Sequence, residues 1–155
     1  MRRASARSAV ALPPAEVLRL WSDTDRWASF VEGFARLVEL GRGWPSEGGR
    51  VVWESAPAGR GRVTETVVES APDRFSTQVF EDALAGTQTL RVLPAGDGSE
   101  AELSLEYELA KYGPLAGIAD ALFIRRALRD SLHRTLRRFA IEAAEDARAL
   151  PDNPA

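Results

Sequence analysis

The last third of the sequence joins a strictly alternating strand to one long amphipathic helix. From Glu102 to Leu109, polar and apolar residues exchange at every position, which is typical of a strand with one wet face and one buried face. The Tyr-Gly-Pro sequence at 112–114 stops this strand, because Gly relaxes the backbone and Pro suits the first turn of a helix. Apolar residues then recur at intervals of three and four from Leu115 to about Arg148. A helix of that length is on the order of 50 Å long, so it must lie across a whole sheet.

The spacing of turn residues predicts the rest of the fold. Ala4–Ala11 alternates like a strand and is followed by two prolines and two short helical segments. Turn clusters divide residues 34–110 into six further strand-like runs, and their short loops make neighbouring strands antiparallel. We therefore predict one α+β domain over residues 1–148, with a frayed tail at 149–155. In it a seven-stranded antiparallel sheet wraps a helix at about 114–147, and two short helices follow the first strand.

Composition and charge exclude several classes of function. The chain has 155 residues, 45% of them hydrophobic, which suits one domain with a substantial core. It has no Cys and one His, so we expect no disulfide framework, no metal and no cofactor. A formal net charge of -3 argues against a nucleic-acid partner. Lys111 is the only lysine among 20 basic residues, which we attribute to the codon habit of a GC-rich genome.

Hydropathy gives no sign of export or membrane insertion. The basic start of the chain is followed by alternating Ala, Ser and Arg rather than an apolar run of signal-peptide length. No apolar stretch is long enough to span a bilayer. We therefore expect a cytoplasmic protein without integral membrane contact, and we leave its oligomeric state open between monomer and homodimer.

The predicted architecture implies a cavity. A strongly twisted sheet cannot touch a straight helix along its whole length, so space remains at one end, walled by sheet, helix and the short helices. Alternation along the strands and the helix face selects the residues expected to line it, although ordinary core packing is the alternative for each. The predicted ligand-binding residues are Trp27, Phe30, Trp53, Phe75, Gln88, Leu90, Tyr107, Leu115, Ile118, Leu122, Arg125 and Arg129.

The order of elements and several short motifs resemble the START-like or SRPBCC superfamily, in particular its small bacterial polyketide cyclase/dehydrase-type members. The motifs are Leu12–Val17 with Trp21–Asp23, Arg26-Trp27, Glu69–Phe75, Gly113–Leu115, and the helix residues Leu128, Leu132 and Leu136. The resemblance covers roughly residues 4–146. It implies a helix-grip fold and a pocket for a hydrophobic, polyketide-, lipid- or aromatic-like molecule. The chain departs from many relatives at Ala28-Ser29, where a proline soon after the tryptophan is absent, which implies a different pocket lip.

The resemblance leaves two classes of function open, because a fold alone does not select an activity. We favour ligand binding of the cyclase/dehydrase type, in which the pocket orients a flexible polyketone. The alternative is a non-enzymatic carrier or sensor for a lipid or quinone. A carrier predicts an almost wholly apolar pocket, whereas an enzyme predicts convergent polar side chains, for which Glu65, Tyr107 and Arg125 are the candidates. A partner-binding module on the Arg-rich outer helix surface is the least favoured class.

Glu65 lies on a strand whose inward face the sequence leaves open. Val63 and Val67 share its face, and Thr64 and Thr66 lie on the other. If the valine face is buried, a carboxylate enters an apolar cavity and becomes suited to general acid–base chemistry. If the threonine face is buried, Glu65 is a solvated surface charge, and we favour this second interpretation.

Other chemically suggestive residues are interpreted as structural. Ser131 lies two residues from His133, which puts the two side chains on different helix faces and excludes a nucleophile–base pair. We expect His133 to be a half-exposed helix residue. The Gly-Arg-Gly sequences at 41–43 and 59–61 lack the spacing of phosphate loops and are interpreted as turns. Trp44 is either a lip residue or packed under its own loop, and both interpretations stay open.

Arg125 and Arg129 give the sharpest prediction. With Ile118 as the centre of the helix stripe and 100° per residue, the two arginines fall about 20° to either side of it. They should then lie on the dry face, where a buried Arg needs a partner. One possibility is that the two arginines extend along the edge of the sheet or pair with Glu or Asp. The other is that at least one lines the cavity and binds an acidic group of the ligand. In the second case, Arg125→Leu or Arg129→Leu should weaken the binding of acidic ligands more than that of neutral ligands.

Overall fold

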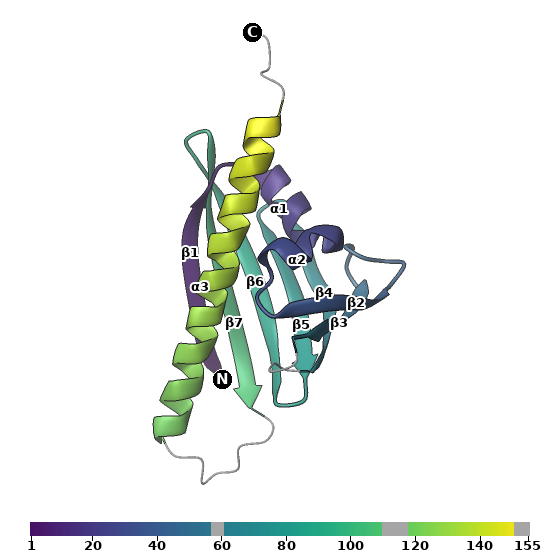
Figure 1. Ribbon diagram of the computed structural model, residues 1–155, viewed down its shortest axis with the longest axis vertical. Helices are drawn as coiled ribbons and strands as arrows, with labels where there is room; N and C mark the ends of the chain where they lie inside the picture. The colour runs from purple at the N-terminus through teal and green to yellow at the C-terminus, as the bar shows by residue number, and fades with distance from the viewer. Residues whose placement is uncertain (57–60, 110–117, 151–155) are drawn as a thin grey trace.

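The computed structural model describes residues 1–56, 61–109 and 118–150, which form a curved sheet closed on one side by a long helix (Figure 1). In chain order the elements are β1 (Arg2–Val10), α1 (Pro14–Ser22), η1 (Thr24–Arg26), α2 (Trp27–Phe30), β2 (Phe34–Leu40), β3 (Arg50–Ser55), β4 (Arg62–Ala71), β5 (Arg74–Glu81), β6 (Leu84–Ala95), β7 (Gly98–Leu109) and α3 (Ile118–Ala149). This is the predicted order of strand, short helices, six strands and long helix.

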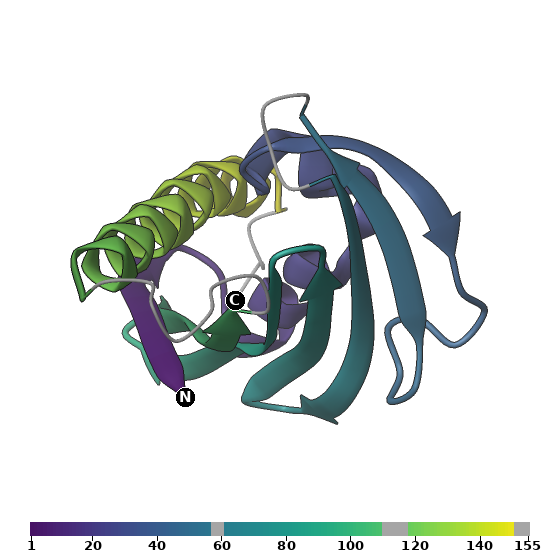
Figure 2. The same cartoon turned by 90° about the horizontal axis from the view of Figure 1, so that it is seen from below.

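All seven strands belong to one antiparallel sheet with the order β1-β7-β6-β5-β4-β3-β2. The first strand pairs with the last, Ala6 lying opposite Leu103, so β1 forms one edge of the sheet beside β7. Seen from below, the sheet bends around an interior bordered by α3 (Figure 2). Gly86 permits close packing of β6 on β7, because a Cβ there would lie 2.4 Å from the carbonyl oxygen of Glu106. The seven-stranded antiparallel architecture is confirmed.

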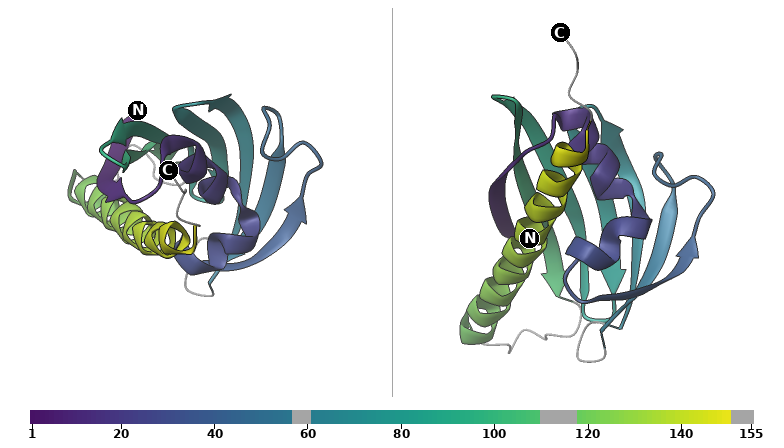
Figure 3. Two further views of the ribbon diagram at one scale, coloured as in Figure 1. Left: turned by 90° about the horizontal axis from the view of Figure 1, so that it is seen from above. Right: turned by 45° about the horizontal axis from the view of Figure 1, so that its top comes forward.

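Helix α3 is unbroken and lies along β1 and α2 rather than over the middle of the sheet (Figures 1 and 3). Leu132, Leu136, Phe139 and Ala143 form its buried stripe together with Leu128, and all five are at most 8% exposed. The expected helix start at 114–117 lies outside the described residues. The division into a domain at 1–148 and a tail at 149–155 stays a prediction.

The short helices connect α3 to the sheet through aromatic rings. Phe30 of α2 packs against Trp21 of α1 and Phe139 of α3, with ring centroids 5.6 and 5.0 Å away. Trp27, also on α2, meets Trp44 and Trp53 edge-on at 5.6 and 6.5 Å. These pairs are offset or edge-to-face, the arrangements that the ring quadrupole favours. The four-residue helix therefore joins the two halves of the core.

An ion pair fastens the same region from outside. Arg26, at the end of η1, donates to the Glu142 carboxylate at 2.7 Å and to the Asp146 carboxylate at 2.8 Å, both on α3. The Arg26 side chain is 33% exposed and the Glu142 side chain 19%, so solvent screens this network less than a pair on the open surface. The C-terminal half of α3 is thereby tied to the connection between α1 and α2.

Arg26→Gln should lower the free energy of unfolding by about 1–2 kcal/mol, between the values typical of exposed and of buried ion pairs. Urea unfolding followed by circular dichroism measures the change. Arg19→Gln is the control, because Arg19 is 75% exposed and pairs with Glu16 within one helix. A loss as large in Arg19→Gln as in Arg26→Gln would contradict the assignment.

Candidate functional site

The interior cavity lies between α3, the short helices and the concave face of the sheet. Every strand from β3 to β7 contributes to its wall, and α3 closes it. The lining residues are Trp21, Trp27, Val31, Glu32, Trp53, Glu65, Phe75, Gln88, Leu103, Leu105, Leu128, Ser131, Leu132 and Thr135. Its volume is about 50 Å³, room for a few water molecules, whereas pockets for small molecules usually measure ~300–1,000 Å³. A ligand larger than a few water molecules therefore fits only if lining side chains or α3 move.

Glu65 is buried in the sheet wall of this cavity and is only 6% exposed. Its carboxylate accepts one hydrogen bond from the indole Nε1 of Trp53 and one from the hydroxyl of Thr77, each 2.8 Å long. The two donors come from β3 and β5, the strands on either side of β4. The sheet thus surrounds a carboxylate with donors and turns it toward the cavity.

The favoured interpretation of Glu65 as a surface charge is wrong. Val63 and Val67 are 0% and 2% exposed, so the valine face of β4 is the inward one, whereas Thr64 and Thr66 are only half-buried. Alternation alone could not decide between the faces because each carries polar and apolar residues. The deciding donors, Trp53 and Thr77, lie 12 residues away in each direction, where a local pattern does not reach.

A second carboxylate, that of Glu32, lines the cavity from the segment after α2. The Glu32 backbone N–H donates to the hydroxyl of Thr135 on α3 at 3.0 Å, and its side chain forms an ion pair with Arg134. Burial alone raises the pKa of Glu32, but hydrogen bonds from Arg134 and Ser131, with the charges of Arg134 and Arg138, outweigh it and hold the pKa below its usual value. At neutral pH this carboxylate is therefore ionised.

Two walls of the cavity consequently present different polar groups. The sheet side offers Glu65 and the amide of Gln88, and the helix side offers Ser131, Thr135 and Glu32. The remaining lining is aromatic and aliphatic. Such a site suits a greasy molecule with one or two oxygen atoms, because the polar side chains fix its orientation and the apolar wall holds its body.

The structure brings four predicted lining residues together in this cavity: Trp27, Trp53, Phe75 and Gln88. Phe30, Leu90 and Tyr107 are inward-facing but lie in the core outside the cavity wall, at 0%, 0% and 1% exposure. The Tyr107 hydroxyl is buried and has no hydrogen-bond partner among the residues that the structure describes.

The predictions on the first turns of α3 have different outcomes. Leu115, and the side chain of Ile118, lie outside the described residues. Leu122 is 61% exposed, and Arg125 and Arg129 are exposed as well, so the prediction of a dry face there is wrong. The buried stripe, which includes Leu128, is centred about 40° from the predicted centre. Arg125 and Arg129 line an outer groove instead of the cavity.

Several lining residues were missed. Leu103 and Leu105 share the inward alternation of Tyr107, and Leu128 and Leu132 belong to the leucine stripe of α3, so signals for them existed. Glu32 gave no signal, because its place depends on how the loop after α2 meets α3. The other members of this missed set are Trp21, Val31, Ser131 and Thr135.

Two residues with open interpretations have structural surroundings. The indole Nε1 of Trp44 donates to the backbone oxygen of Ser22 at 2.8 Å, and its ring packs edge-on against Trp27 and Phe75. Packing is thus the better interpretation of Trp44. His133 is exposed on α3, more so than the half-exposed position expected for it.

A family model described as polyketide cyclase / dehydrase and lipid transport matches residues 1–144. The chain belongs to this family. Membership indicates binding of a hydrophobic small molecule as the general class of function. The predicted START-like, SRPBCC resemblance is confirmed. Among curated proteins no match was found.

Solved structures share the fold at low sequence identity. A protein of Thermus thermophilus aligns with a TM-score of 0.76 and 19% identity over 94% of this chain and 99% of its own. The di-domain ARO/CYC protein StfQ of the steffimycin biosynthetic pathway aligns with a TM-score of 0.75 and 17% identity over 94% of this chain and 51% of its own. A START superfamily protein of Mycobacterium smegmatis aligns with a TM-score of 0.75 and 14% identity, over 92% of this chain and 97% of its own.

The described part of the chain holds neither a metal-ligand cluster nor a membrane-spanning helix. No group of three or more His, Asp or Glu side chains in 1–56, 61–109 and 118–150 is placed to hold a metal ion. Within the same ranges, no helix combines the length and the apolar character needed to cross a membrane.

Thr77→Val should destabilise the protein by about 1–3 kcal/mol, because it removes a hydrogen bond to the buried Glu65 carboxylate without changing the side-chain shape. Urea unfolding at pH 7 measures the loss. Thr66→Val is the matched control, since Thr66 lies on the opposite face of β4. A neutral Thr77→Val would show that this hydrogen bond contributes nothing.

Glu32→Gln should remove part of the acid sensitivity of the fold. The folded pKa of Glu32 lies below the unfolded value of 4.5, so its ion pair adds stability that is complete above 4.5 and is lost as the pH falls through the folded pKa. The variant should be less stable than the wild type at pH 7, and the gap should narrow toward pH ~3. Urea unfolding across this range tests it, with Glu16→Gln as control. A gap that stays constant with pH would contradict the assignment.

Proposed function

We propose that this protein binds a hydrophobic molecule of polyketide or aromatic type in the interior cavity and acts on it as a cyclase or dehydratase. The observation that carries the proposal is the Glu65 carboxylate, buried in the cavity wall and oriented by Trp53 and Thr77. A buried carboxylate is costly unless it is well hydrogen-bonded, and an apolar residue would fill the same space without that cost. Its presence supports a chemical task.

The proposed task of Glu65 is to accept a proton or a hydrogen bond from an enol, phenol or hydroxyl group of the ligand. In a ring closure, the carbon next to a ketone loses a proton to a base and attacks a second carbonyl carbon of the same chain. The alkoxide so formed takes the proton back from the protonated base. The hydroxyl group then leaves as water with a hydrogen of the neighbouring carbon, and a C=C bond forms in the ring. The enclosing wall brings the two carbons together, an effect that needs few catalytic groups. Gln88 and Thr135 line the cavity with groups that can donate to carbonyl oxygens, whereas the hydroxyl of Ser131 already donates to Glu32.

The cavity of about 50 Å³ must widen to admit such a ligand. Leu128 and Leu132, 8% and 7% exposed, lie on the α3 side of the cavity and are the side chains whose displacement opens it. The polar lining favours the enzyme over a carrier, for which an almost wholly apolar pocket was predicted. A cytoplasmic location, and the choice between monomer and homodimer, stay predictions from the sequence.

Binding is tested with two probes that differ in one hydroxyl group, 2-naphthol and naphthalene. Trp21, Trp27 and Trp53 line the cavity, so intrinsic tryptophan fluorescence reports occupancy. We expect 2-naphthol to bind about tenfold more tightly than naphthalene, because its hydroxyl donates to the carboxylate. Glu65→Gln should reduce this preference severalfold, and Glu69→Gln, on the same strand, should not. Equal affinities in the wild type, or no binding of either probe, would refute the site.

Catalysis is tested separately with a linear poly-β-ketone thioester and mass spectrometry. The wild type should form a product lighter by one water molecule faster than the uncatalysed reaction, and Glu65→Gln should form it at the background rate. Binding without this product would identify the protein as a carrier. Native mass spectrometry of freshly purified protein, which detects co-purified ligands, would then identify the cargo.

A further inference from the structure

A second concave region lies on the outer surface, where the first turns of α3 pass the edge strand β1. It is an open groove of about 1240 Å³, separate from the interior cavity. The residues lining it are Arg3, Ala4, Ser5, Arg7, Arg91, Glu102, Leu122, Phe123, Arg125, Arg126 and Arg129. We call this set the outer groove. None of its residues lines the interior cavity.

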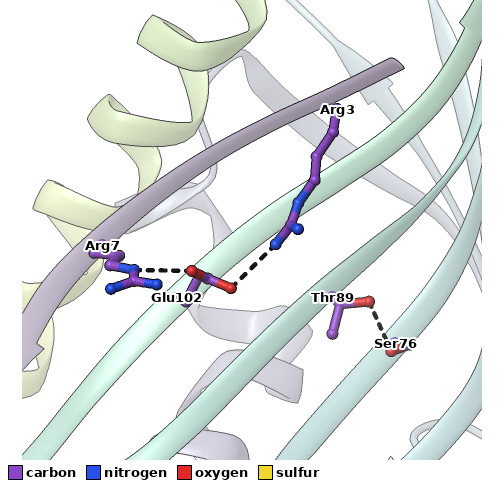
Figure 4. A network of polar contacts seen from close by, with 5 residues as sticks. All are labelled: Arg3, Arg7, Ser76, Thr89 and Glu102. Atoms are coloured by element: carbon purple, nitrogen blue, oxygen red, sulfur yellow. Dashed lines mark hydrogen bonds and ion pairs between the residues drawn. The ribbon is translucent and has the colours of Figure 1, made fainter. Parts of the chain in front are cut away.

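The outer groove concentrates positive charge on an acidic protein. Six arginines and one glutamate line it, whereas the whole chain has a formal net charge of -3. Glu102 already accepts from Arg3 at 3.2 Å and from Arg7 at 2.8 Å (Figure 4). No carboxylate of a described residue forms an ion pair with Arg91, Arg125, Arg126 or Arg129. The groove is therefore an unneutralised site for an anionic partner.

Two large apolar side chains of α3 line the groove and are exposed to solvent. Leu122 is 61% exposed and Phe123 is 73% exposed. Leu122 lies at intervals of three, four and seven from the three arginines, so it heads the helix face that carries Arg125, Arg126 and Arg129. Large apolar side chains next to several arginines on one helix are typical of a helix that lies in a membrane interface.

We propose that the outer groove docks the protein on an anionic lipid surface, with Leu122 and Phe123 entering the acyl boundary and the arginines contacting the lipid headgroups. Leu122 and Phe123 are consecutive, so they project about 100° apart around the helix. Side chains so divergent do not enter one narrow partner groove together, but both enter a fluid interface. Arg side chains reach outward while their stems stay apolar, which suits the headgroup layer. This docking is independent of the interior cavity and of the proposed activity.

Vesicle co-sedimentation tests the proposal, using phosphatidylcholine alone and with about a third phosphatidylglycerol. Anionic vesicles should bind the wild type at least tenfold more tightly than neutral ones, and added NaCl should weaken the binding. The triple variant Arg125→Gln/Arg126→Gln/Arg129→Gln should bind anionic vesicles about tenfold more weakly. The double variant Leu122→Ser/Phe123→Ser should show a loss of similar size.

Matched controls separate this surface from general charge and hydrophobicity. Arg19→Gln/Arg36→Gln/Arg62→Gln removes the same charge from exposed positions outside the groove, and Leu93→Ser removes an apolar side chain that is also 61% exposed. Both controls should bind within twofold of the wild type. Circular dichroism confirms that each variant is folded.

Depth of insertion is measured by replacing Phe123 with Trp. The fluorescence of Phe123→Trp should shift to the blue when anionic vesicles are added, whereas that of Leu93→Trp should not. Equal binding to neutral and anionic vesicles, or control variants as weak as the groove variants, would overturn the proposal. It is also overturned if the arginine variant loses affinity while Leu122→Ser/Phe123→Ser keeps it and Phe123→Trp shows no shift, since that result indicates an acidic macromolecule bound by charge alone.

Discussion

The structure depends on the aromatic contacts of the four-residue helix α2. A helix this short has no stability of its own, so its packing holds it. Phe30 reaches Trp21 and Phe139 on the helical side, and Trp27 reaches Trp53 on the sheet side. Through these rings α2 spaces α3 from the distant strands and keeps it beside β1. The space left between α3 and the middle of the sheet is the interior cavity.

The aromatic wall also supplies the polar chemistry of the cavity. Trp53, which packs against Trp27, donates its indole N–H to Glu65. A Trp used as a donor inside a core fixes the position of its acceptor, because the ring has one N–H and is itself held by packing. Thr77 on the next strand provides the second bond. These two hydrogen bonds fix the orientation of the Glu65 carboxylate in the cavity wall. An apolar residue at this position would make the fold more stable, because it would avoid the cost of burying a charge.

The sequence was sufficient for the fold because each strand alternates and each turn is marked by Gly, Pro or Asp, signals that act over a few residues. The sequence was insufficient where contacts between distant segments determine which side chains line the cavity. Glu65 faces the cavity because β3 and β5 present donors to it, and Glu32 lines the cavity because α3 passes the loop after α2. The exposure of Leu122 and Arg125 was missed because the helix stripe was centred on Ile118, whereas the side chains that the fold buries, from Leu128 to Ala143, are centred on a face rotated from it.

The two ends of α3 are held differently, which determines where the cavity can widen. The C-terminal half is bound by the Arg26 ion pairs with Glu142 and Asp146 and by the ring of Phe139. The N-terminal half, by contrast, exposes Leu122 and carries its arginines on the outside. Under the proposed function, widening that preserves these contacts begins in the N-terminal half, next to the cavity wall at Leu128 and Leu132. That half also contributes Leu122 and Phe123 to the outer groove, which shares no lining residue with the cavity.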